Sequence, residues 1–224
     1  MLISGKGGVP YFLFFVFCFL LLFSCKENKK YHDAANVEIL ESNSDAVNEI
    51  LRFQAGMNAE FKDPKTSPLP DRYRADFDKL DFFQPDTNYR VLAKLVRTPE
   101  ALPFHMPTTT DRTSEEVVYG IVHFYLNGSE RQLEVYRSQN PESDGEGDDY
   151  LFLPFLDDTN GKETYGGGRY LDLSIPNGDS LMIDFNKAYN PYCAYNKKYS
   201  CPIVPKVNQL QTEVRAGVKA FGKF

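Results

Sequence analysis

An Asn-Gly pair at Asn127-Gly128 constrains the fold more than any other feature of this sequence, because it separates two segments that alternate between apolar and polar residues. The segments are residues 117–126 and 131–137. A period of two is that of a half-buried β-strand, and Asn-Gly favours the two-residue hairpin turn, whose central residues both have positive φ. Such a turn places Val122 opposite Leu133 on one face. The sequence therefore predicts an antiparallel hairpin here.

A second Asn-Gly pair, Asn177-Gly178, lies between residues 168–176 and 180–187. Both flanking segments carry apolar residues at every second position, and a one-residue slip would turn either set away from the core. A three-residue loop buries both sets and places Leu173 opposite Ile183. The sequence thus predicts a second hairpin with a defined register.

That register sets polar groups against each other on the other face of the second hairpin. Asp172 falls opposite Asp184, and Tyr170 falls opposite Asn186. Like charges directly opposite destabilise a sheet, so the pair needs compensation. One alternative is neutralisation by Lys162, Arg169 or Lys187. The other is that the two carboxylates share a proton, hold a cation or act as acid and base, in a polar pocket formed by Asp172, Asp184, Asn186, Tyr170 and Glu163.

Short strands dominate the remaining pattern. Residues 89–97 alternate as a strand, and residues 104–108 and 150–156 fit further strands. Val47 to Phe61 has helical spacing and stops at Asp63-Pro64, because proline cannot continue a helix. Residues 71–80 fit a short helix, and the tail after Pro205 fits either a helix capped by Asn208 or a final strand. We expect a mainly β (α+β) fold, which is a single antiparallel β-barrel or β-sandwich of about seven strands with an N-terminal amphipathic helix packed on it.

The N-terminus carries an unbroken apolar run, residues 11–23, preceded by Lys6. The run is shorter than the roughly 20 apolar residues of a membrane-spanning helix, and a basic start followed by a short apolar segment is typical of a signal peptide. A buried core helix is the alternative, although the run has no polar face. We expect residues 1–24 to be removed on export.

Cys25 follows the small residue Ser24 at the end of this run, and the pattern resembles the lipobox of bacterial lipoproteins. The resemblance implies a lipid anchor on Cys25, which would attach the protein to the membrane, since acyl chains of several buried methylenes bind membranes stably. A chance cysteine after an ordinary signal peptide is the alternative. Residues 25–41 would form a lipidated tether, and residues 42–224 would form a single mostly-β domain. Lys26 weakly favours the outer membrane, facing the periplasm.

The charge of the mature chain argues against one class of partner. Without Lys6, 24 of the 25 basic residues remain against 31 acidic ones, which gives a net charge of −7. An acidic chain without a basic run is repelled by phosphate backbones. We therefore expect no nucleic-acid partner.

Two cysteines, Cys193 and Cys201, remain after the signal and the anchor are set aside. In an oxidising compartment such thiols tend to pair, so we expect a disulfide that closes a nine-residue ring, with a reactive dithiol as the alternative. The three histidines, His32, His105 and His123, show no metal-binding spacing with each other or with these cysteines. We expect neither a metal nor a cofactor.

A glycine-rich stretch, residues 161–173, pairs Gly161-Lys162 with three later glycines. A phosphate-binding loop needs its glycines before the lysine and a Ser or Thr directly after it. Here Glu163 follows the lysine, so a nucleotide loop is excluded. The glycines then serve a tight turn with positive φ, or allow the backbone to approach a ligand closely.

Several strings in the sequence are similar to one family. They are FKDPKTSPLP, GKETYGGGRYLDL, DFNKAYNPYCAYN and CPIVP, followed by NQL and RAG. Together they resemble the bacterial domain-of-unknown-function family 1684 over roughly residues 45–221. The resemblance implies exported or lipid-anchored members with one compact domain and no established activity, so no catalytic role is carried over; Val218 stands where an acid is expected. The motif positions are site candidates only: Lys162, Glu163, Tyr165, Arg169, Asp172, Asp184, Asn186, Tyr189, Asn190, Cys193 and Cys201.

Four tyrosines crowd into eleven residues, Tyr189 to Tyr199. Such rings either pack on the domain or stack on a sugar or small polar ligand. The sequence lacks a Ser-His-Asp arrangement, an HExxH motif and a nucleophile elbow. We therefore expect a cell-envelope module that binds a small polar ligand, a glycan or a protein partner. The alternatives are a hydrolase that uses Asp172 and Asp184 with Lys162, and a purely structural lipoprotein.

Overall fold

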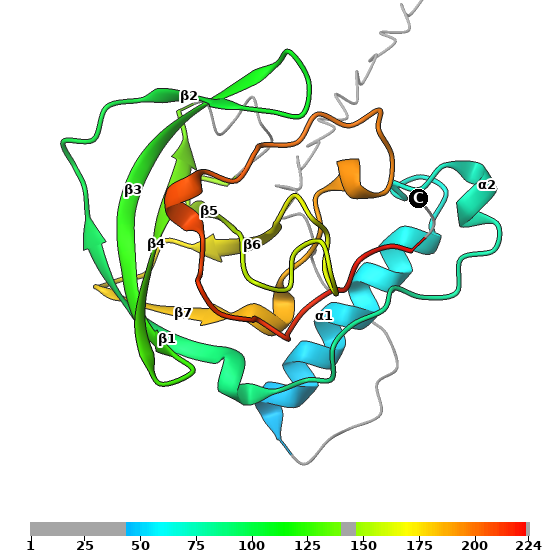
Figure 1. Cartoon of the computed structure of the whole chain (residues 1–224), viewed down its shortest axis with the longest axis horizontal. Helices are drawn as coiled ribbons and strands as arrows, with labels where there is room; N and C mark the ends of the chain where they lie inside the picture. Colours follow the sequence, from blue (N-terminus) through cyan, green and yellow to red (C-terminus); the bar gives the residue numbers. More distant parts are fainter. Residues whose placement is uncertain (1–43, 140–146, 223–224) are drawn as a thin grey trace, which may run out of the picture.

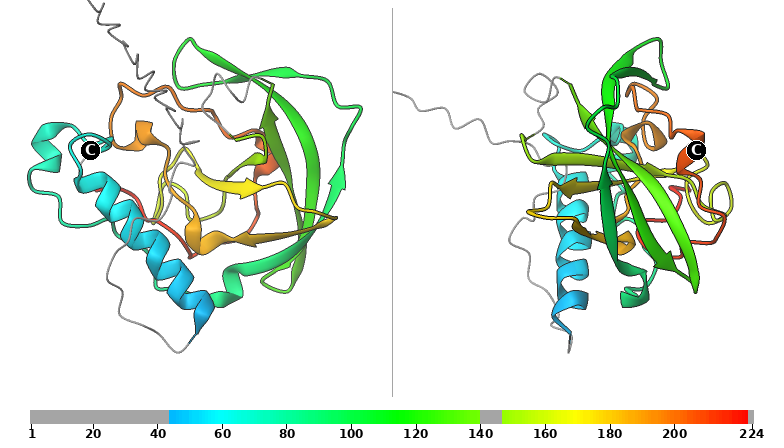
Figure 2. Two further views of the ribbon diagram at one scale, coloured as in Figure 1. Left: turned by 180° about the vertical axis from the view of Figure 1, so that it is seen from behind. Right: turned by 90° about the vertical axis from the view of Figure 1, so that its left-hand side faces the viewer.

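The structure is a computed structural model that describes residues 44–139 and 147–222 (Figure 1). Seven antiparallel strands form one sheet in the order β6-β5-β4-β3-β1-β7, with β2 paired to β3. The strands are β1 (Arg90–Arg97), β2 (Phe104–Pro107), β3 (Thr113–Leu126), β4 (Ser129–Ser138), β5 (Tyr150–Phe155), β6 (Arg169–Ser174) and β7 (Ser180–Asp184). The sheet curls into a half-barrel (Figures 1 and 2). A mainly β, antiparallel, seven-stranded fold is thus confirmed, in an open and not a closed form.

The first predicted hairpin is confirmed in turn and in register. Asn127 has φ 51° and Gly128 has φ 74°, as the two-residue turn requires. Val122 pairs with Leu133. A β-bulge between Val118 and Gly120 shifts the register further along, and it places Tyr119 in the core.

The second predicted hairpin is wrong. β6 pairs with β5, which sets Asp172 opposite Phe152, and β7 pairs with β1, which sets Asp184 opposite Arg90. The two strands are the two edges of the path through the sheet, and because the sheet curls, residues 175–179 suffice to connect them. The apolar positions fix which face each strand turns to the core, but they do not fix which strand it pairs with.

Both faces of the sheet are covered where β4, β5 and β6 lie. Odd-numbered residues such as Leu133, Leu151 and Leu171 join one core cluster with Phe185 and Val214. Even-numbered residues join a second cluster, because side chains alternate along a strand. This second cluster contains Tyr136, Phe152, Tyr170 and Tyr189 together with residues of α1.

The long helix α1 (Asp45–Lys62) lies beside the curled sheet (Figure 2). It ends where Asp63 and Pro64 follow, and its buried residues are Ile50, Met57 and Phe61. The Phe61 ring meets the Tyr195 ring edge-on, with ring centroids 4.7 Å apart. The helix therefore contributes to the second core cluster.

The other expected helices are short or missing from the described chain. Residues 71–80 contain only α2 (Asp71–Arg74). Short 3-10 turns occur at η1 (Thr87–Tyr89), η2 (Phe185–Lys187), η3 (Tyr192–Ala194) and η4 (Lys206–Asn208). The described tail beyond η4 forms neither a helix nor a strand of the sheet. Side-chain contacts and isolated β-bridges hold it in place instead.

The predicted signal peptide, the lipidation site Cys25 and the tether lie outside the described residues. Within the described ranges, no helix has the length and apolarity that a membrane crossing demands.

Candidate functional site

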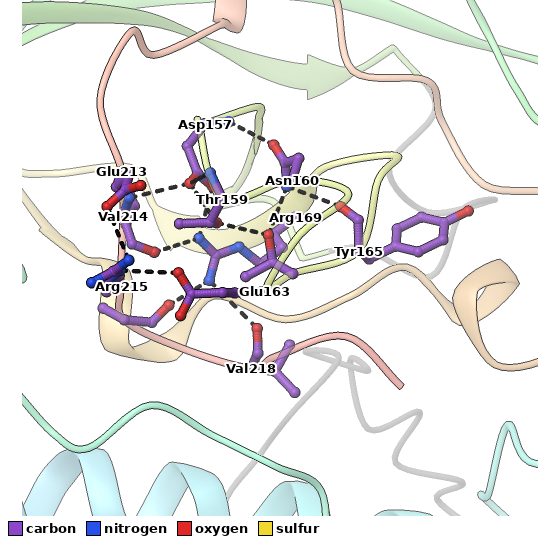
Figure 3. Close-up of polar contacts among 12 residues, drawn as sticks. Asp157, Thr159, Asn160, Glu163, Tyr165, Arg169, Glu213, Val214, Arg215 and Val218 are labelled. Carbon is purple, nitrogen blue, oxygen red and sulfur yellow. Dashed lines mark hydrogen bonds and ion pairs between the residues drawn. The ribbon is translucent and has the colours of Figure 1, made fainter. Parts of the chain in front are cut away.

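Arg169, the arginine of the glycine-rich stretch, is fully buried and holds the chain together (Figure 3). Its Nη2 lies 2.8 Å from Asp157 Oδ2 and donates to the carbonyl of Val214 at 2.8 Å. Its Nη1 donates to the carbonyl of Ala216. Burial lowers the pKa of the Arg169 guanidinium, and the charge of Asp157 opposes this effect. The side chain thus fastens residues 214–218 to the sheet.

The loop before Arg169 is organised around the same carboxylate. Asp157 Oδ1 accepts hydrogen bonds from the backbone N–H and the hydroxyl of Thr159, at 2.9 Å and 2.6 Å. Glu163 forms an ion pair of 3.0 Å with Arg215, while Lys162 is exposed. The predicted candidates Glu163 and Arg169 therefore belong to a structural clamp between residues 157–169 and 213–218.

Asp184 and Asn186 form a second structural unit. Asn186 donates its backbone N–H and its Nδ2 to Asp184 Oδ1, at 3.0 Å and 2.8 Å. The side-chain amide of Asn186 also accepts a hydrogen bond from the backbone N–H of Asp86 and donates one to its carbonyl. These bonds secure the chain just before η1. The predicted cross-strand pairing of Asp172 with Asp184 does not form, because β6 pairs with β5 and β7 pairs with β1.

Asn190, another candidate, is buried beside the tail. Its Nδ2 donates to the carbonyl of Lys219 at 2.9 Å and to the Tyr195 hydroxyl at 3.2 Å. Its role is therefore to join the η3 region to the tail.

Three predicted candidates do come together. Tyr189 and Tyr150 both donate their hydroxyls to Asp172 Oδ1, the latter at 2.8 Å. Tyr170 packs edge-on against Tyr189, with ring centroids 5.9 Å apart. Two backbone hydrogen bonds of 2.9 Å and 3.0 Å also join Tyr170 to Tyr189. Asp172 therefore orients two of these aromatic rings.

These rings form part of a pocket of about 210 Å³ between the sheet and residues 189–202. Five tyrosines line it: Tyr150, Tyr170, Tyr189, Tyr192 and Tyr199. Phe152, Pro191 and Pro202 add apolar surface, and Arg112, Ser114, Glu116, Ser200 and Cys201 add polar groups. We name this the tyrosine pocket.

The tyrosine rings are held in place by their hydroxyls. Two of them, those of Tyr150 and Tyr189, bind Asp172 as described above. The Tyr170 hydroxyl donates to the carbonyl of Pro202, and the Tyr192 hydroxyl donates to Glu60 of α1. Four of the five hydroxyls are thus engaged in the wall. The pocket therefore offers fixed ring surfaces, and further polar groups come from other residues.

Those polar groups lie mainly on β3 and in the loop that precedes it. Glu116 is buried, and Arg112 donates to the hydroxyl and carbonyl of Ser200 at 3.2 Å and 3.1 Å. The Ser114 Oγ is buried and has no hydrogen-bond partner in the ranges that the structure covers. A pocket with aromatic walls and a few fixed polar groups is the usual form of a small-molecule site.

Cys193 and Cys201 are free thiols in the structure and not the disulfide expected from the sequence. They are neighbours nevertheless, since the Cys193 backbone N–H donates to Cys201 Sγ at 3.1 Å. The Tyr165 hydroxyl lies 4.0 Å from Cys193 Sγ. In the described chain, no three His, Cys, Asp or Glu residues gather where they could hold a metal ion.

Sequence reasoning missed most of the pocket, including Arg112, Ser114, Glu116 and Tyr150. One signal was present. Residues 150–155 read YLFLPF without alternation, and a continuous apolar strand is one that is covered on both faces. The aromatic residues on its second face could have pointed to a second core with a site of its own.

The structure thus defines a class, a single β half-barrel domain with an aromatic pocket on one face of its sheet. This chain belongs to the family described as "Protein of unknown function (DUF1684)", which matches residues 75–219. The resemblance inferred from the sequence strings is thereby confirmed over that range, while bacterial origin and lipoprotein character stay predictions.

A solved structure is similar to this chain. It is the solution NMR structure of an uncharacterized protein from Haloarcula marismortui, which is 33% identical. The alignment covers 79% of this chain and 95% of that one, with a TM-score of 0.62. No curated protein matches the chain. The comparisons therefore establish the family without assigning an activity.

Proposed function

We propose that the tyrosine pocket binds a small ring-shaped polar molecule, and that a single sugar unit is the best fit. The observation that carries the proposal is the set of five tyrosine rings around one cavity, four of them fixed by their hydroxyls. Rings that are already ordered lose little conformational entropy on binding, which favours affinity.

The size of the pocket limits the ligand. At about 210 Å³ it exceeds the roughly 150 Å³ of a cavity that accepts benzene. It is smaller than the roughly 300–1,000 Å³ of pockets for drug-sized molecules. One ring with its substituents therefore matches this volume.

The polar groups favour a sugar over an aromatic heterocycle. A sugar ring combines an apolar C–H face, which can pack on a tyrosine ring, with hydroxyls around its edge. Glu116 can accept hydrogen bonds from such hydroxyls, and Arg112 can donate to them. The paired-carboxylate hydrolase loses the register that supported it, because Asp172 and Asp184 are not cross-strand partners, so we favour binding over catalysis.

The binding test uses protein-observed and ligand-observed NMR with neutral monosaccharides, N-acetylated amino sugars and single-ring heterocycles. Ser114→Phe fills the pocket, so we expect at least about a tenfold loss of affinity, equivalent to 1.4 kcal/mol. Tyr125→Ala is the matched control, because Tyr125 is exposed on β3 and does not line the pocket. Equal affinity in Ser114→Phe and the native chain would show that the ligand binds elsewhere. Binding of heterocycles alone would exclude the sugar.

We also propose that the protein is exported and lipid-anchored through Cys25, with residues 26–41 as a tether. The sequence before the domain supports this proposal, since a short apolar run ends in Ser24-Cys25. The pocket would then lie in the cell envelope, at the outer membrane and facing the periplasm, where it would meet free sugars or the ends of glycans.

A further inference from the structure

We infer that Cys193 and Cys201 are a redox-reversible cross-link that sets the affinity of the tyrosine pocket, an inference that rests on the proposed ligand-binding function. The pair is neither exposed nor distant from the pocket. Cys201 itself lines the pocket, and Cys193 lies in η3 next to Tyr192, another lining residue.

The positions of the two thiols allow a bond between them. Cys201 Sγ accepts the backbone N–H of Cys193 at 3.1 Å. Because the nitrogen and the Cβ of Cys193 are attached to the same Cα, the Cys201 sulfur lies beside the Cys193 side chain. A disulfide requires two cysteines that are close neighbours, and the contact of Cys201 Sγ with the Cys193 backbone, together with the hydrogen bond between the two thiols, places them so.

The two thiols differ in a way that assigns their roles. Cys193 is half-buried, and a hydrogen bond from the Cys201 thiol lowers its pKa to about 7, with help from the Tyr165 hydroxyl. Cys201 is buried, and the same hydrogen bond together with burial raises its pKa. The thiolate is the nucleophile in thiol–disulfide exchange. Cys193 is therefore the attacking thiol and Cys201 the resolving thiol.

The exchange is balanced with a disulfide as the oxidant, either a low-molecular-weight one or that of a protein. The Cys193 thiolate attacks one sulfur of the oxidant, forms a mixed disulfide and releases one thiolate. Cys201 then loses its proton and attacks the Cys193 sulfur, which releases the second thiolate. The protein gives up two electrons and two protons, and the oxidant becomes two thiols.

The bond would act on the pocket through the segment that it closes. Residues 193–201 form a nine-residue ring, and within it Tyr199, Ser200 and Cys201 line the pocket. Cross-linking restricts the conformations of this wall in the free protein. The pocket wall then loses less conformational entropy when a ligand binds, so the oxidised form binds the ligand more tightly.

The test equilibrates the full chain in glutathione redox buffers and follows three measurements. Mass spectrometry after alkylation counts free thiols, hydrogen exchange reports the backbone of residues 192–202, and NMR titration with N-acetylglucosamine reports affinity. We expect oxidation to remove two thiols, to slow exchange in this segment and to raise affinity about fivefold. Cys193→Ser, which does not alter a lining side chain, should bind like the reduced native chain in every buffer.

The outcomes separate the inference from the proposed function. Failure of the native chain to lose both thiols at any buffer ratio overturns the cross-link. Equal affinity of the oxidised and reduced forms overturns the regulation and leaves ligand binding intact. Absence of N-acetylglucosamine binding in both forms, with the disulfide formed and exchange slowed, removes the sugar site and with it the regulation. Near-UV circular dichroism of Cys193→Ser checks that the variant is folded, and Cys193→Ala replaces it if it is not.

Discussion

Arg169 shows how much of the fold can depend on one charged side chain. Its guanidinium is completely buried, and it binds the Asp157 carboxylate and the backbone carbonyls of Val214 and Ala216. Moving a charge out of water is costly unless the charge is paired and hydrogen-bonded. The residue therefore stabilises the fold only as long as this set of acceptors is complete.

Arg169→Met should destabilise the domain by about 3–5 kcal/mol, because it leaves the Asp157 carboxylate buried without its partner. Urea denaturation followed by tyrosine emission measures this, since the chain has 14 tyrosines and no tryptophan. Arg215→Met is the matched control. Arg215 is half-exposed in its ion pair with Glu163, so the change should cost less than about 1 kcal/mol. Similar losses in both variants would contradict the clamp.

For single residues, the sequence identified several that make specific contacts but did not predict the role of those contacts. The glycine-rich stretch marked Lys162, Glu163 and Arg169 as candidates, and two of them make specific contacts, but these contacts hold the fold. A buried ion pair and a ligand contact use the same residue types, so a sequence pattern cannot distinguish them. Tyr170 and Asp172 were chosen through a register that does not occur, and Tyr189 was chosen through the family resemblance. All three nevertheless line or support the pocket.

Among the elements, β1 and β3 approach each other closely at Gly120. A Cβ atom there would lie 2.7 Å from the Val96 carbonyl oxygen and 2.8 Å from Leu95 Cδ1. The first of these is a backbone atom and cannot rotate away. The pairing of β1 with the long hairpin therefore depends on glycine at this position.

Gly120→Ala should cost about 1–3 kcal/mol, because the methyl group forces the two strands apart. Gly178→Ala is the control, since a Cβ at Gly178 would meet no atom within 4 Å. That change should be neutral or stabilise the chain by up to about 1 kcal/mol, through the lower entropy of the unfolded state. Thermal unfolding of the two variants and the native chain, measured in parallel, compares their stabilities. A Gly120→Ala protein as stable as the native chain would show that the strands can separate without loss.

The attachment of α1 to the sheet should depend on pH through Glu49. A hydrogen bond from Lys187 and the charges of Lys187 and Arg90 lower the pKa of Glu49. A carboxylate with a lowered pKa stabilises the folded state above its unfolded pKa, about 4.3 for glutamate, and this contribution is lost as the pH falls through the folded-state pKa.

Glu49→Gln should therefore reduce stability at pH 7 and make little difference at pH 3. Urea midpoints of the native and variant chains at the two pH values measure the effect, and hydrogen exchange in residues 45–62 assigns it to α1. Glu49 is partly exposed, so the effect should be modest and should shrink at high salt. An identical difference at both pH values would exclude the ion pairs as its cause.

The elements were predictable where local chemistry determines them. Asn127-Gly128 fixed a turn with two positive φ values, and that hairpin has the predicted register. Asn177-Gly178 looked equivalent, but the strands beside it pair with β5 and β1. Pairing between strands that are far apart in the chain depends on the curl of the whole sheet, and no local pattern encodes that.

For the whole molecule, the position of the domain depends on the proposed lipid anchor. Cys25→Ala should move the protein from the membrane fraction to the soluble fraction, because the acyl chains supply about 0.8 kcal/mol for each buried methylene. Cell fractionation and mass spectrometry of the mature N-terminus measure this. Folding should not change, since Cys25 precedes the domain. Recovery of the variant in the membrane fraction would contradict anchoring at this residue.

The open side of the half-barrel has a consequence for partner binding. The free edge of a sheet normally invites another chain to add a strand, but Tyr189 already occupies the edge of β6 through its paired backbone bonds with Tyr170. A protein that docked there by strand addition would first have to expel Tyr189, and the wall of the cavity would leave with it. Occupancy of the cavity and recruitment of a chain to this edge are therefore mutually exclusive, so a bound small molecule would compete with such a partner without touching it.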